Sequence, residues 1–342
     1  MAKELYCTAT NISDIISVIV STSHNASTAT AQIITRNKTV NIGDNITIDM
    51  GYVGDFEKVF KGYVKNITRN VPNDIYTIVA KDDLVRALDF FIVPTDPDDS
   101  FRRSNISAES LVEQVLALAG ITNFTYTPTN FTFAVTAGNE VEVKLTSSYD
   151  FCKMISDLLT WHLYADEDGL VHFINRKPHV MYGTSGQPGD IADVAINAGN
   201  PLTYTVTLNT SLTESDHDLR NRVVVHGKTG VFAEASDNES YNPLTDAMEE
   251  IMPAGFYKSM ALLTPIIDTQ DMAQTTADYN LDLYNKLTVS ASLACEGNPD
   301  FLARRVIEVN DTVLGLTGNW YIYSSEMQFS KEGFITNMEL RK

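Results

Sequence analysis

Cysteine is scarce in this chain. Its 342 residues include only Cys7, Cys152 and Cys295, and no two of them are close enough to form a CxxC pair. An odd number of widely spaced cysteines argues against both a disulfide framework and a zinc site. We expect buried structural thiols at Cys152, on the apolar side of a helix, and at Cys295, at a strand end. Such a chain is typical of a reducing cytoplasm.

Long hydrophobic runs are also absent. No apolar stretch approaches the ~20 residues that a membrane span requires. The opening MAKELYCTATN lacks the basic and then apolar layout of a signal peptide. We therefore expect no stable membrane association. Without a signal sequence, the many Asn-x-Ser/Thr triplets do not indicate glycosylation.

Sequence motifs for catalysis are missing as well. None of the six histidines lies in an HExxH pattern, and no GxSxG elbow is present. The glycine-rich stretch 183–194 has no following Lys-Ser/Thr, so we interpret it as a linker rather than a phosphate-binding loop. We predict no enzyme, no catalytic residue, no cofactor and no metal. Because carboxylates are plentiful, a hidden glycosidase pair keeps a cell-wall hydrolase open as an alternative.

Basic residues are few. The chain has 25 Lys and Arg against 44 Asp and Glu, for a net charge of −19. This balance argues against a protein held to nucleic acid by phosphate neutralisation. The imbalance lies in residues 96–300, with 11 basic and 29 acidic groups, whereas residues 1–95 and 301–342 are almost neutral. We expect negative potential on the middle of the chain and little on its ends.

Short predicted strands separated by polar turns make up most of the two ends of the sequence. The stretch Gly54–Asp83 is predicted to form strand, turn and strand, with Pro72-Asn73-Asp74 in the turn. Leu316–Lys342 repeats this pattern, and each copy follows an upstream strand, at 42–48 and 309–315. These similarities predict a diverged internal duplication, although two unrelated hairpins would give the same local patterns. Gly62 and Gly318 are expected at comparable places, where a strand bends or closely approaches another backbone.

Two helices are predicted between these ends. Ser107 is placed to cap a helix over 109–119, which Gly120 ends, and Ser148 to cap a second helix over 149–162. A hairpin with Asp168-Gly169 in its turn follows. We interpret the neighbouring Asp166, Glu167 and Asp168 as a solvated hairpin tip rather than a metal or catalytic site.

These patterns together resemble the hub proteins of phage tail baseplates. The run from Gly54 through VFKGYVKNI to YTIVAKDDLVRAL resembles the first barrel of that family, and the closing GNWYIYSSEMQFSKEGFITNMEL resembles the last hairpin of its second barrel. The capped helices and DG hairpin are similar to its inserted domain, and 220–227 to the strand that enters the second barrel. The chain departs from the family at Arg304-Arg305, where a glycine commonly precedes the last strands.

The resemblance implies a mainly β, α+β fold with two tube-type barrels related by internal duplication. The expected parts are a first barrel at 1–95, an inserted α+β domain at 96–182, a second barrel at 183–227 plus 290–342, and an acidic insertion with a helix at 228–289. As structural markers of these barrels we take Gly62, Asp82, Gly227, Gly318 and Tyr321.

The function implied by the resemblance is that of a structural hub in a phage tail baseplate or a related contractile device. Such a hub is a homotrimer whose six barrels adapt a sixfold tail tube to a threefold spike. The implied partners are the tail tube or a tube-initiator protein, the central spike protein and baseplate wedge proteins, with DNA only as passing cargo. The implied location is the virion tail baseplate, after assembly in the host cytoplasm. The alternative from another class is a surface glycan-binding β-protein.

Overall fold

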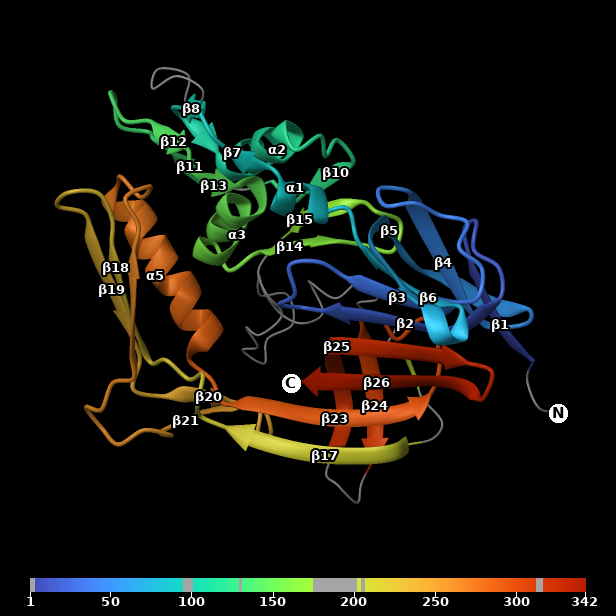
Figure 1. Ribbon diagram of the computed structural model, residues 1–342. Coiled ribbons are helices and arrows are strands. Elements are labelled where there is room, and N and C mark those ends of the chain that lie inside the picture. The colour runs from blue at the N-terminus through green and yellow to red at the C-terminus, as the bar shows by residue number, and fades with distance from the viewer. Residues whose placement is uncertain (1–3, 95–100, 129–130, 175–201, 204–206, 312–315) are drawn as a thin grey trace.

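Strands from both ends of the chain form one twelve-stranded sheet in the computed structural model (Figure 1). The structure describes residues 4–94, 101–128, 131–174, 202–203, 207–311 and 316–342. We call the first six strands unit 1 and the other six unit 2. Unit 1 consists of β1 (Leu5–Ala9), β2 (Ile15–Ser23), β3 (Thr30–Thr35), β4 (Asn45–Tyr52), β5 (Asp55–Asn70) and β6 (Ile75–Lys81). Unit 2 consists of β16 (Leu202–Thr203), β17 (Thr207–Ser215), β23 (Thr288–Glu296), β24 (Val306–Asp311), β25 (Leu316–Ser330) and β26 (Gly333–Arg341).

The two units have the same strand order. It is β1-β4-β5-β6-β3-β2 in unit 1 and β16-β24-β25-β26-β23-β17 in unit 2. The one reversal is the outermost strand, since β1 runs antiparallel to β4 whereas β16 runs parallel to β24. A shared order over six strands confirms the predicted internal duplication and the mainly β class.

Register irregularities recur at matching places in the two units. Lys65 is the extra residue in the β5–β6 ladder, and Tyr323 is the extra residue at the same point of β25–β26. Ile16 in β2–β3 and Leu208 in β17–β23 form a second matching pair. A bulge bends its strand and is retained within families as a designed feature. Two shared bulges therefore support common descent of the units more strongly than strand number does.

The units are continuous with each other. β2 pairs antiparallel with β25 over Ser17–Ser23 and Ser324–Ser330, so unit 1 leads directly into unit 2. Among the described strands neither ladder closes on itself, and the expected pair of barrels is therefore two open units joined edge to edge. One hydrophobic cluster fills both units; it includes Val18, Ile33, Ile46, Phe60, Leu293, Phe301, Trp320 and Leu340.

The inserted α+β domain begins with α1 directly after β6, earlier than the predicted residue 96, and its described residues contain three helices. The predicted capping residue Ser107 is confirmed, because its Oγ accepts a hydrogen bond from Ser110 N at 3.4 Å, and Gly120 lies beyond the helix end with φ +74°. The second cap is Ser147 rather than Ser148, with Asp150 N donating to its Oγ at 2.9 Å. The elements are α1 (Val85–Asp89), β7 (Phe91–Ile92), β8 (Phe101–Arg103), β9 (Ile106–Ser107), α2 (Ala108–Leu118), β10 (Phe124–Tyr126), β11 (Thr132–Phe133), β12 (Val141–Val143), β13 (Thr146–Ser147), α3 (Ser148–Leu158), β14 (His162–Ala165) and β15 (Val171–Ile174).

The second insertion begins earlier than expected. We predicted that residues 220–227 enter the second barrel, but β18 (Arg222–His226) pairs with β19 (Phe232–Ser236) and β22 (Ser259–Leu263) in a separate three-stranded sheet. In unit 2, the place predicted for residues 220–227 is held by β17. The remaining elements of this insertion are β20 (Ser240–Asn242), β21 (Ala247–Glu249) and α5 (Gln270–Tyr284).

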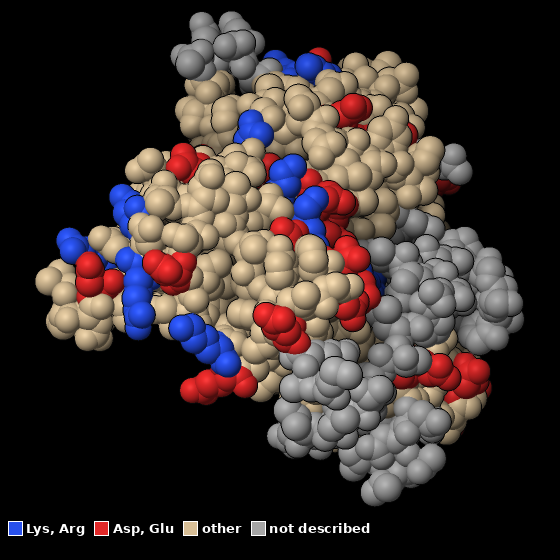
Figure 2. Space-filling model, turned by 90° about the vertical axis from the view of Figure 1, so that its right-hand side faces the viewer, with Lys and Arg blue, Asp and Glu red and all other residues tan. Residues whose placement is uncertain are grey.

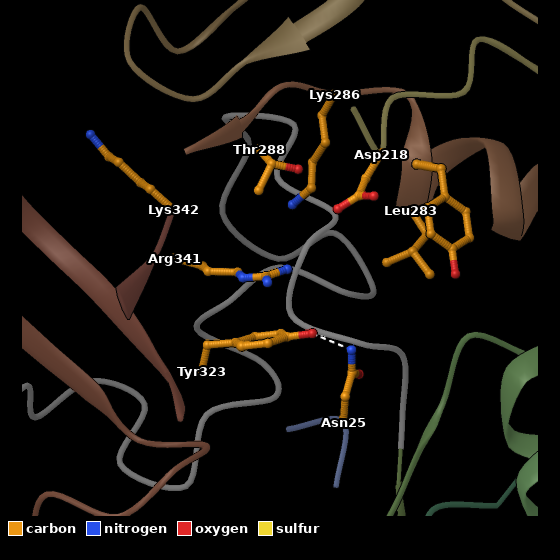
Figure 3. A pocket seen from close by; sticks show the side chains of 9 residues that line it. Asn25, Asp218, Leu283, Lys286, Thr288, Tyr323, Arg341 and Lys342 are labelled. Atoms are coloured by element: carbon orange, nitrogen blue, oxygen red, sulfur yellow. Dashed lines mark hydrogen bonds between the residues drawn. The ribbon is translucent and has the colours of Figure 1, made fainter. Parts of the chain in front are cut away.

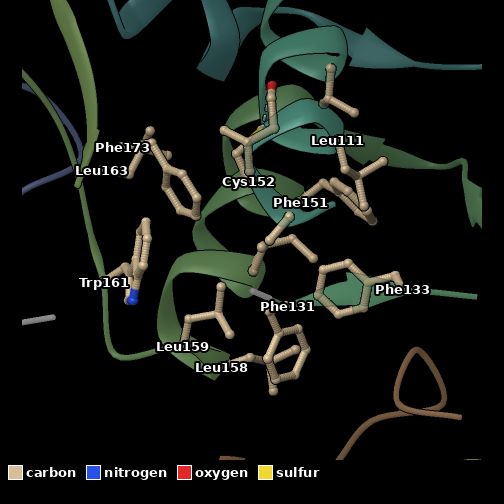
Figure 4. Packing of buried hydrophobic residues seen from close by; sticks show 14 of the residues in the cluster. Leu111, Phe131, Phe133, Phe151, Cys152, Leu158, Leu159, Trp161, Leu163 and Phe173 are labelled. Atoms are coloured by element: carbon tan, nitrogen blue, oxygen red, sulfur yellow. Dashed lines mark hydrogen bonds between the residues drawn. The ribbon is translucent and has the colours of Figure 1, made fainter. Parts of the chain in front are cut away.

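The two insertions share a second hydrophobic core. In the inserted domain, aromatic side chains from β11, α3 and β15 pack around α2 (Figure 4). The same cluster extends to β18, β19 and α5 through residues such as Val223, Ala233 and Ala277. Asn280 Nδ2 on α5 also donates to Leu158 O at 3.3 Å. The insertions therefore form one body beside the large sheet (Figure 1).

Candidate functional site at the junction

Three parts of the chain meet at His24, which follows β2. Its Nδ1 lies 3.0 Å from the Tyr321 hydroxyl on β25. The Tyr323 ring stacks on it at 5.0 Å, and the His162 ring at the start of β14 contacts it edge-on at 4.4 Å. Unit 1, unit 2 and the inserted domain each contribute one side of this cluster, which is almost wholly buried. We call this place the junction.

Arg304 occupies a left-handed backbone conformation at the junction, with φ +74°. This conformation costs an L-residue with a side chain about 1 kcal/mol or more. Its guanidinium lies 4.4 Å from the centre of the Tyr164 ring and donates through Nη2 to Ser23 O at 2.7 Å. Arg304, noted in the sequence as a departure from the glycine of the resembled family, thus connects unit 2 with unit 1 and with the inserted domain. These contacts offset the backbone strain.

The tip of the β14–β15 hairpin docks onto both units. Glu167 Oε1 accepts from Arg305 Nη2 at 2.7 Å, and Asp168 forms an ion pair with Lys58 of β5. Asp166 Oδ2 lies 2.7 Å from His172 Nε2. The predicted Asp168-Gly169 turn is present and Asp168 is exposed, but the tip is not simply solvated, because Asp166 and Glu167 are half-buried and each of the three carboxylates has a partner. Because the Arg305–Glu167 pair is partly buried, it is less screened than a surface pair.

Asp82 lies under the junction and is 2% exposed. Burial raises the pKa of its carboxyl to about 7, against the opposing effects of two backbone hydrogen bonds and the charge of Arg304. The donors are Ala29 N at 2.6 Å and Leu84 N at 3.0 Å. Asp82 therefore links β6 to the β2–β3 turn and to the first helix of the insertion. It titrates within the neutral range, unlike an ordinary aspartate.

The predicted equivalence of Gly62 and Gly318 is wrong. In unit 1, Ile46 faces Gly62 and Tyr63 faces Lys81; in unit 2, Ile307 faces Trp320 and Tyr321 faces Arg341. The place of Gly62 is therefore held by Trp320, and Tyr321 matches Tyr63.

The two glycines have different roles. A Cβ on Gly62 would lie 2.1 Å from Lys81 O, so this position is a close backbone approach. Gly318 has φ +86°, and a Cβ built on it would have no other atom within 4 Å. It therefore marks a bend, which glycine adopts without strain.

The marker Gly227 lies outside the large sheet. It directly follows β18, its N–H donates to Val231 O at 3.0 Å, and a Cβ there would lie 2.5 Å from Ile267 O. Its place is a tight turn of the second insertion. Of the five markers, Asp82 and Tyr321 lie at the junction, whereas Gly62, Gly227 and Gly318 do not.

The junction is closely packed. The cavity between Asp82, Tyr164 and Arg304 has a volume of only about 20 Å³, little more than one water requires. Within the described residues, no group of three or more His, Cys, Asp or Glu side chains is arranged to hold a metal ion. In the same part of the chain, no helix is long and apolar enough to span a membrane. What the arrangement can do is fix the insertions relative to the two units.

Charge is mixed on the face of the molecule drawn in Figure 2. Basic and acidic side chains lie beside one another there rather than in fields of one sign. Opposite charges also form exposed ion pairs, such as Lys65–Asp89 and Arg69–Asp74. The negative potential expected on the middle of the chain stays a prediction.

Sequence reasoning missed most of the junction. His24 and Tyr321 are 297 positions apart, and no local pattern connects them. Asp82 and Tyr321 were selected only as barrel markers, and Arg304-Arg305 was noted only as a departure from glycine, so no pattern predicted that these residues meet.

Comparison with known proteins shows the fold. No protein-family model matches the chain, and no curated protein matches it in sequence. Among solved structures, it is similar to a 43 kDa tail protein of prophage MuSo2 from Shewanella oneidensis, with 12% identity, a TM-score of 0.63, and coverage of 99% of this chain and 97% of the other. A tail protein from Neisseria meningitidis MC58 gives 9% identity and a TM-score of 0.64, over 99% and 97% of the two chains.

A third similar structure comes from a secretion system. The Escherichia coli c3393 protein, a component of the type VI secretion system, gives 8% identity and a TM-score of 0.55, over 98% of this chain and 76% of the other. It is described as structurally similar to the T4 bacteriophage tail proteins gp27 and gp5. The chain therefore has the fold of these phage tail proteins along nearly its whole length.

Proposed function

We propose that the chain is a structural, non-enzymatic hub of a phage tail baseplate or a related contractile device. In this proposal three copies form a ring in the virion tail, assembled in the host cytoplasm. Six similar units then face a sixfold tail tube or tube-initiator protein on one side, and the threefold symmetry of the ring serves a central spike protein. Wedge proteins surround the ring, and DNA passes through it. The observation that carries the proposal is the duplicated strand order of units 1 and 2.

In the proposed ring, the contact inside one chain is repeated between neighbouring chains. β2 and β17 hold corresponding places in the two units, as do β25 and β5. Inside the chain, β2 of unit 1 pairs with β25 of unit 2. In a ring of six equivalent units, the next contact joins β17 of one chain to the second half of β5 of its neighbour.

Both of these strand edges are unpaired within the described residues. Within the described residues, β17 pairs only with β23, and the second half of β5 pairs only with β6. Residues 65, 66 and 68–70 of β5 are exposed. Exposed strand edges are templates for pairing and favour aggregation unless a neighbour covers them. The proposed ring covers them with equivalent strands.

The register of this contact follows from the shared bulges. Ser21 faces Glu326 inside the chain, and the equivalent positions are Thr213 on β17 and Thr68 on β5. Facing residues on antiparallel strands have Cα atoms about 4.5–5.5 Å apart, which suits a disulfide. We therefore expect Thr213→Cys together with Thr68→Cys to give covalent dimers and trimers on oxidation.

The equivalent pair inside the chain is the matched control. Ser21→Cys with Glu326→Cys should form a disulfide inside one chain, so the mass of the denatured protein should stay that of a monomer. Each single substitution at Thr213 or Thr68 should give no covalent trimer on oxidation. Native mass spectrometry establishes the oligomer before oxidation. A monomer in assembled particles would overturn the ring, whereas a trimer that does not cross-link would overturn this register.

A further inference from the structure

A small cavity next to the junction holds cations that face one another. It has a volume of about 270 Å³ and lies where the segment after α5 meets the end of β26. Figure 3 shows the side chains of Lys286 and Arg341 reaching into the same space. Tyr323 lies beneath the guanidinium, 3.4 Å from the ring centre to Arg341 Cζ. The rest of the lining is Asn25, Asp218, Leu283, Tyr284, Thr288 and Lys342.

Lys286 is a buried lysine whose amine has no counter-ion within the described residues. The residue is 8% exposed, and its ammonium makes no hydrogen bond or ion pair within the described residues. Burial, and then the charge of Arg341, lower its pKa well below the ordinary value. An uncompensated buried ammonium costs several kcal/mol. The charged form of Lys286 is therefore disfavoured in the free chain, and an anion held beside it would offset that cost.

The neighbouring charges leave the cavity positive. Arg341 Nε and Nη2 both donate to one oxygen of Glu339, at 3.1 and 3.0 Å, and its Nη1 makes no hydrogen bond within the described residues. Asp218 also lines the space, but it is exposed and more than the 4.0 Å of an ion pair from Lys286. Figure 3 shows its carboxylate directed toward the same space as Lys286, but because the residue is exposed, water screens its charge.

We propose that the cavity binds a small oxyanion of the phosphate class. The ion sits between Lys286 Nζ and Arg341 Nη1, with the Thr288 hydroxyl as a neutral donor. A guanidinium with a free N–H and an ammonium are the groups that proteins use for such anions. The cavity is smaller than the ~300–1,000 Å³ of sites for drug-sized ligands, which favours a single oxyanion group over an extended ligand.

Binding has a consequence for the position of the second insertion. Lys286 follows α5, whereas Arg341 ends the last strand of unit 2. An anion held by both side chains fixes the insertion to unit 2 across a contact that is otherwise between like charges. Because a nearby anion favours the charged ammonium, binding also draws a proton onto Lys286.

Isothermal titration of the full chain with inorganic phosphate tests this proposal. Runs at constant ionic strength in two buffers of different ionisation heat report proton uptake. We expect saturable binding of one phosphate, with heats that differ between the buffers. Lys286→Met should weaken binding at least tenfold and abolish the buffer dependence. Lys331→Met, in the exposed turn after β25, should bind like the unmodified chain.

A second variant and a second ligand complete the test. Thr288→Val removes one neutral donor and should weaken binding several-fold while leaving proton uptake in place, even if Lys286→Met does not fold. A nucleoside monophosphate that binds more tightly than phosphate would assign the anion to a nucleotide, and a weaker one would assign it to inorganic phosphate. Heats that match those of chloride at equal ionic strength, or full binding by folded Lys286→Met, would overturn the site.

Discussion

Replacing Asp82 with asparagine should change how stability depends on pH. Asp82 is the buried carboxyl beneath the junction, with a pKa of about 7 against an ordinary value of 3.8. Between these two values the folded chain holds a proton that the unfolded chain has released. Stability from this group is therefore fully present below pH 3.8 and is lost as the pH rises through 7.

The size of the effect follows from the two pKa values. Linkage gives a loss of roughly 2.5 kcal/mol between pH 5 and pH 8 from this one carboxyl. The Asp82→Asn variant would have no such slope, because an amide does not titrate in this range. The substitution also disturbs one of the two backbone hydrogen bonds from Ala29 and Leu84. This costs about 1 kcal/mol at every pH.

Urea denaturation of both proteins at pH 5, 6, 7 and 8 gives the assay. We expect Asp82→Asn to be about 1 kcal/mol less stable than the unmodified chain at pH 5 and about 1.5 kcal/mol more stable at pH 8, so that the two stability curves cross between these pH values. Val64→Ala is a control without a titrating group in the same unit, since Val64 is fully buried and its loss should be similar at every pH. All samples need one protein concentration, because assembly adds to apparent stability. Parallel curves for Asp82→Asn and the unmodified chain would refute the raised pKa.

Three further predictions concern the strands, the hairpin tip and catalysis. Gly62→Ala should destabilise the chain by about 3 kcal/mol or more, because the new Cβ would meet Lys81 O. Gly318→Ala should cost only about 1 kcal/mol, because its backbone has a positive φ but open space around it. Chemical denaturation that ranks the two variants the other way would contradict the register. Arg305→Met should leave the partly buried Glu167 without its partner and cost about 1–3 kcal/mol, with faster proteolysis of the inserted domain; unchanged proteolysis would count against docking of the hairpin tip. The pure protein should not clear a peptidoglycan suspension, and clearing that disappears on mutating one carboxylate would restore the hydrolase alternative.

Local features were predictable because their causes are local. Ser107 caps α2 and Gly120 ends it as the sequence indicated, since capping depends on residues within one turn. The second cap was displaced by one position because Thr146-Ser147-Ser148 offers two adjacent serines. The backbone, not the residue type, decides which serine accepts the bond from Asp150 N.

The junction was not predictable because its causes are distant in sequence. The Asp166-Glu167-Asp168 run has the composition of a solvated turn, and only the packed fold places Arg305 and Lys58 beside it. β18 was misassigned for a related reason. Its alternating Val223 and Val225 suit any half-buried strand, and the sequence does not say which sheet receives them.

The duplication shows which information the two units retain. Strand order and two bulge positions are common to both, while Gly62 and Trp320, which hold the same ladder position, are the smallest and the largest residues. In unit 1 that position lets two backbones approach, and in unit 2 it fills the shared core with an indole that is 0% exposed. Pairing the two glycines therefore misaligned the copies by two residues. Bulges are the better guide, because an extra residue shifts every following pair and is hard to lose without repacking a whole face.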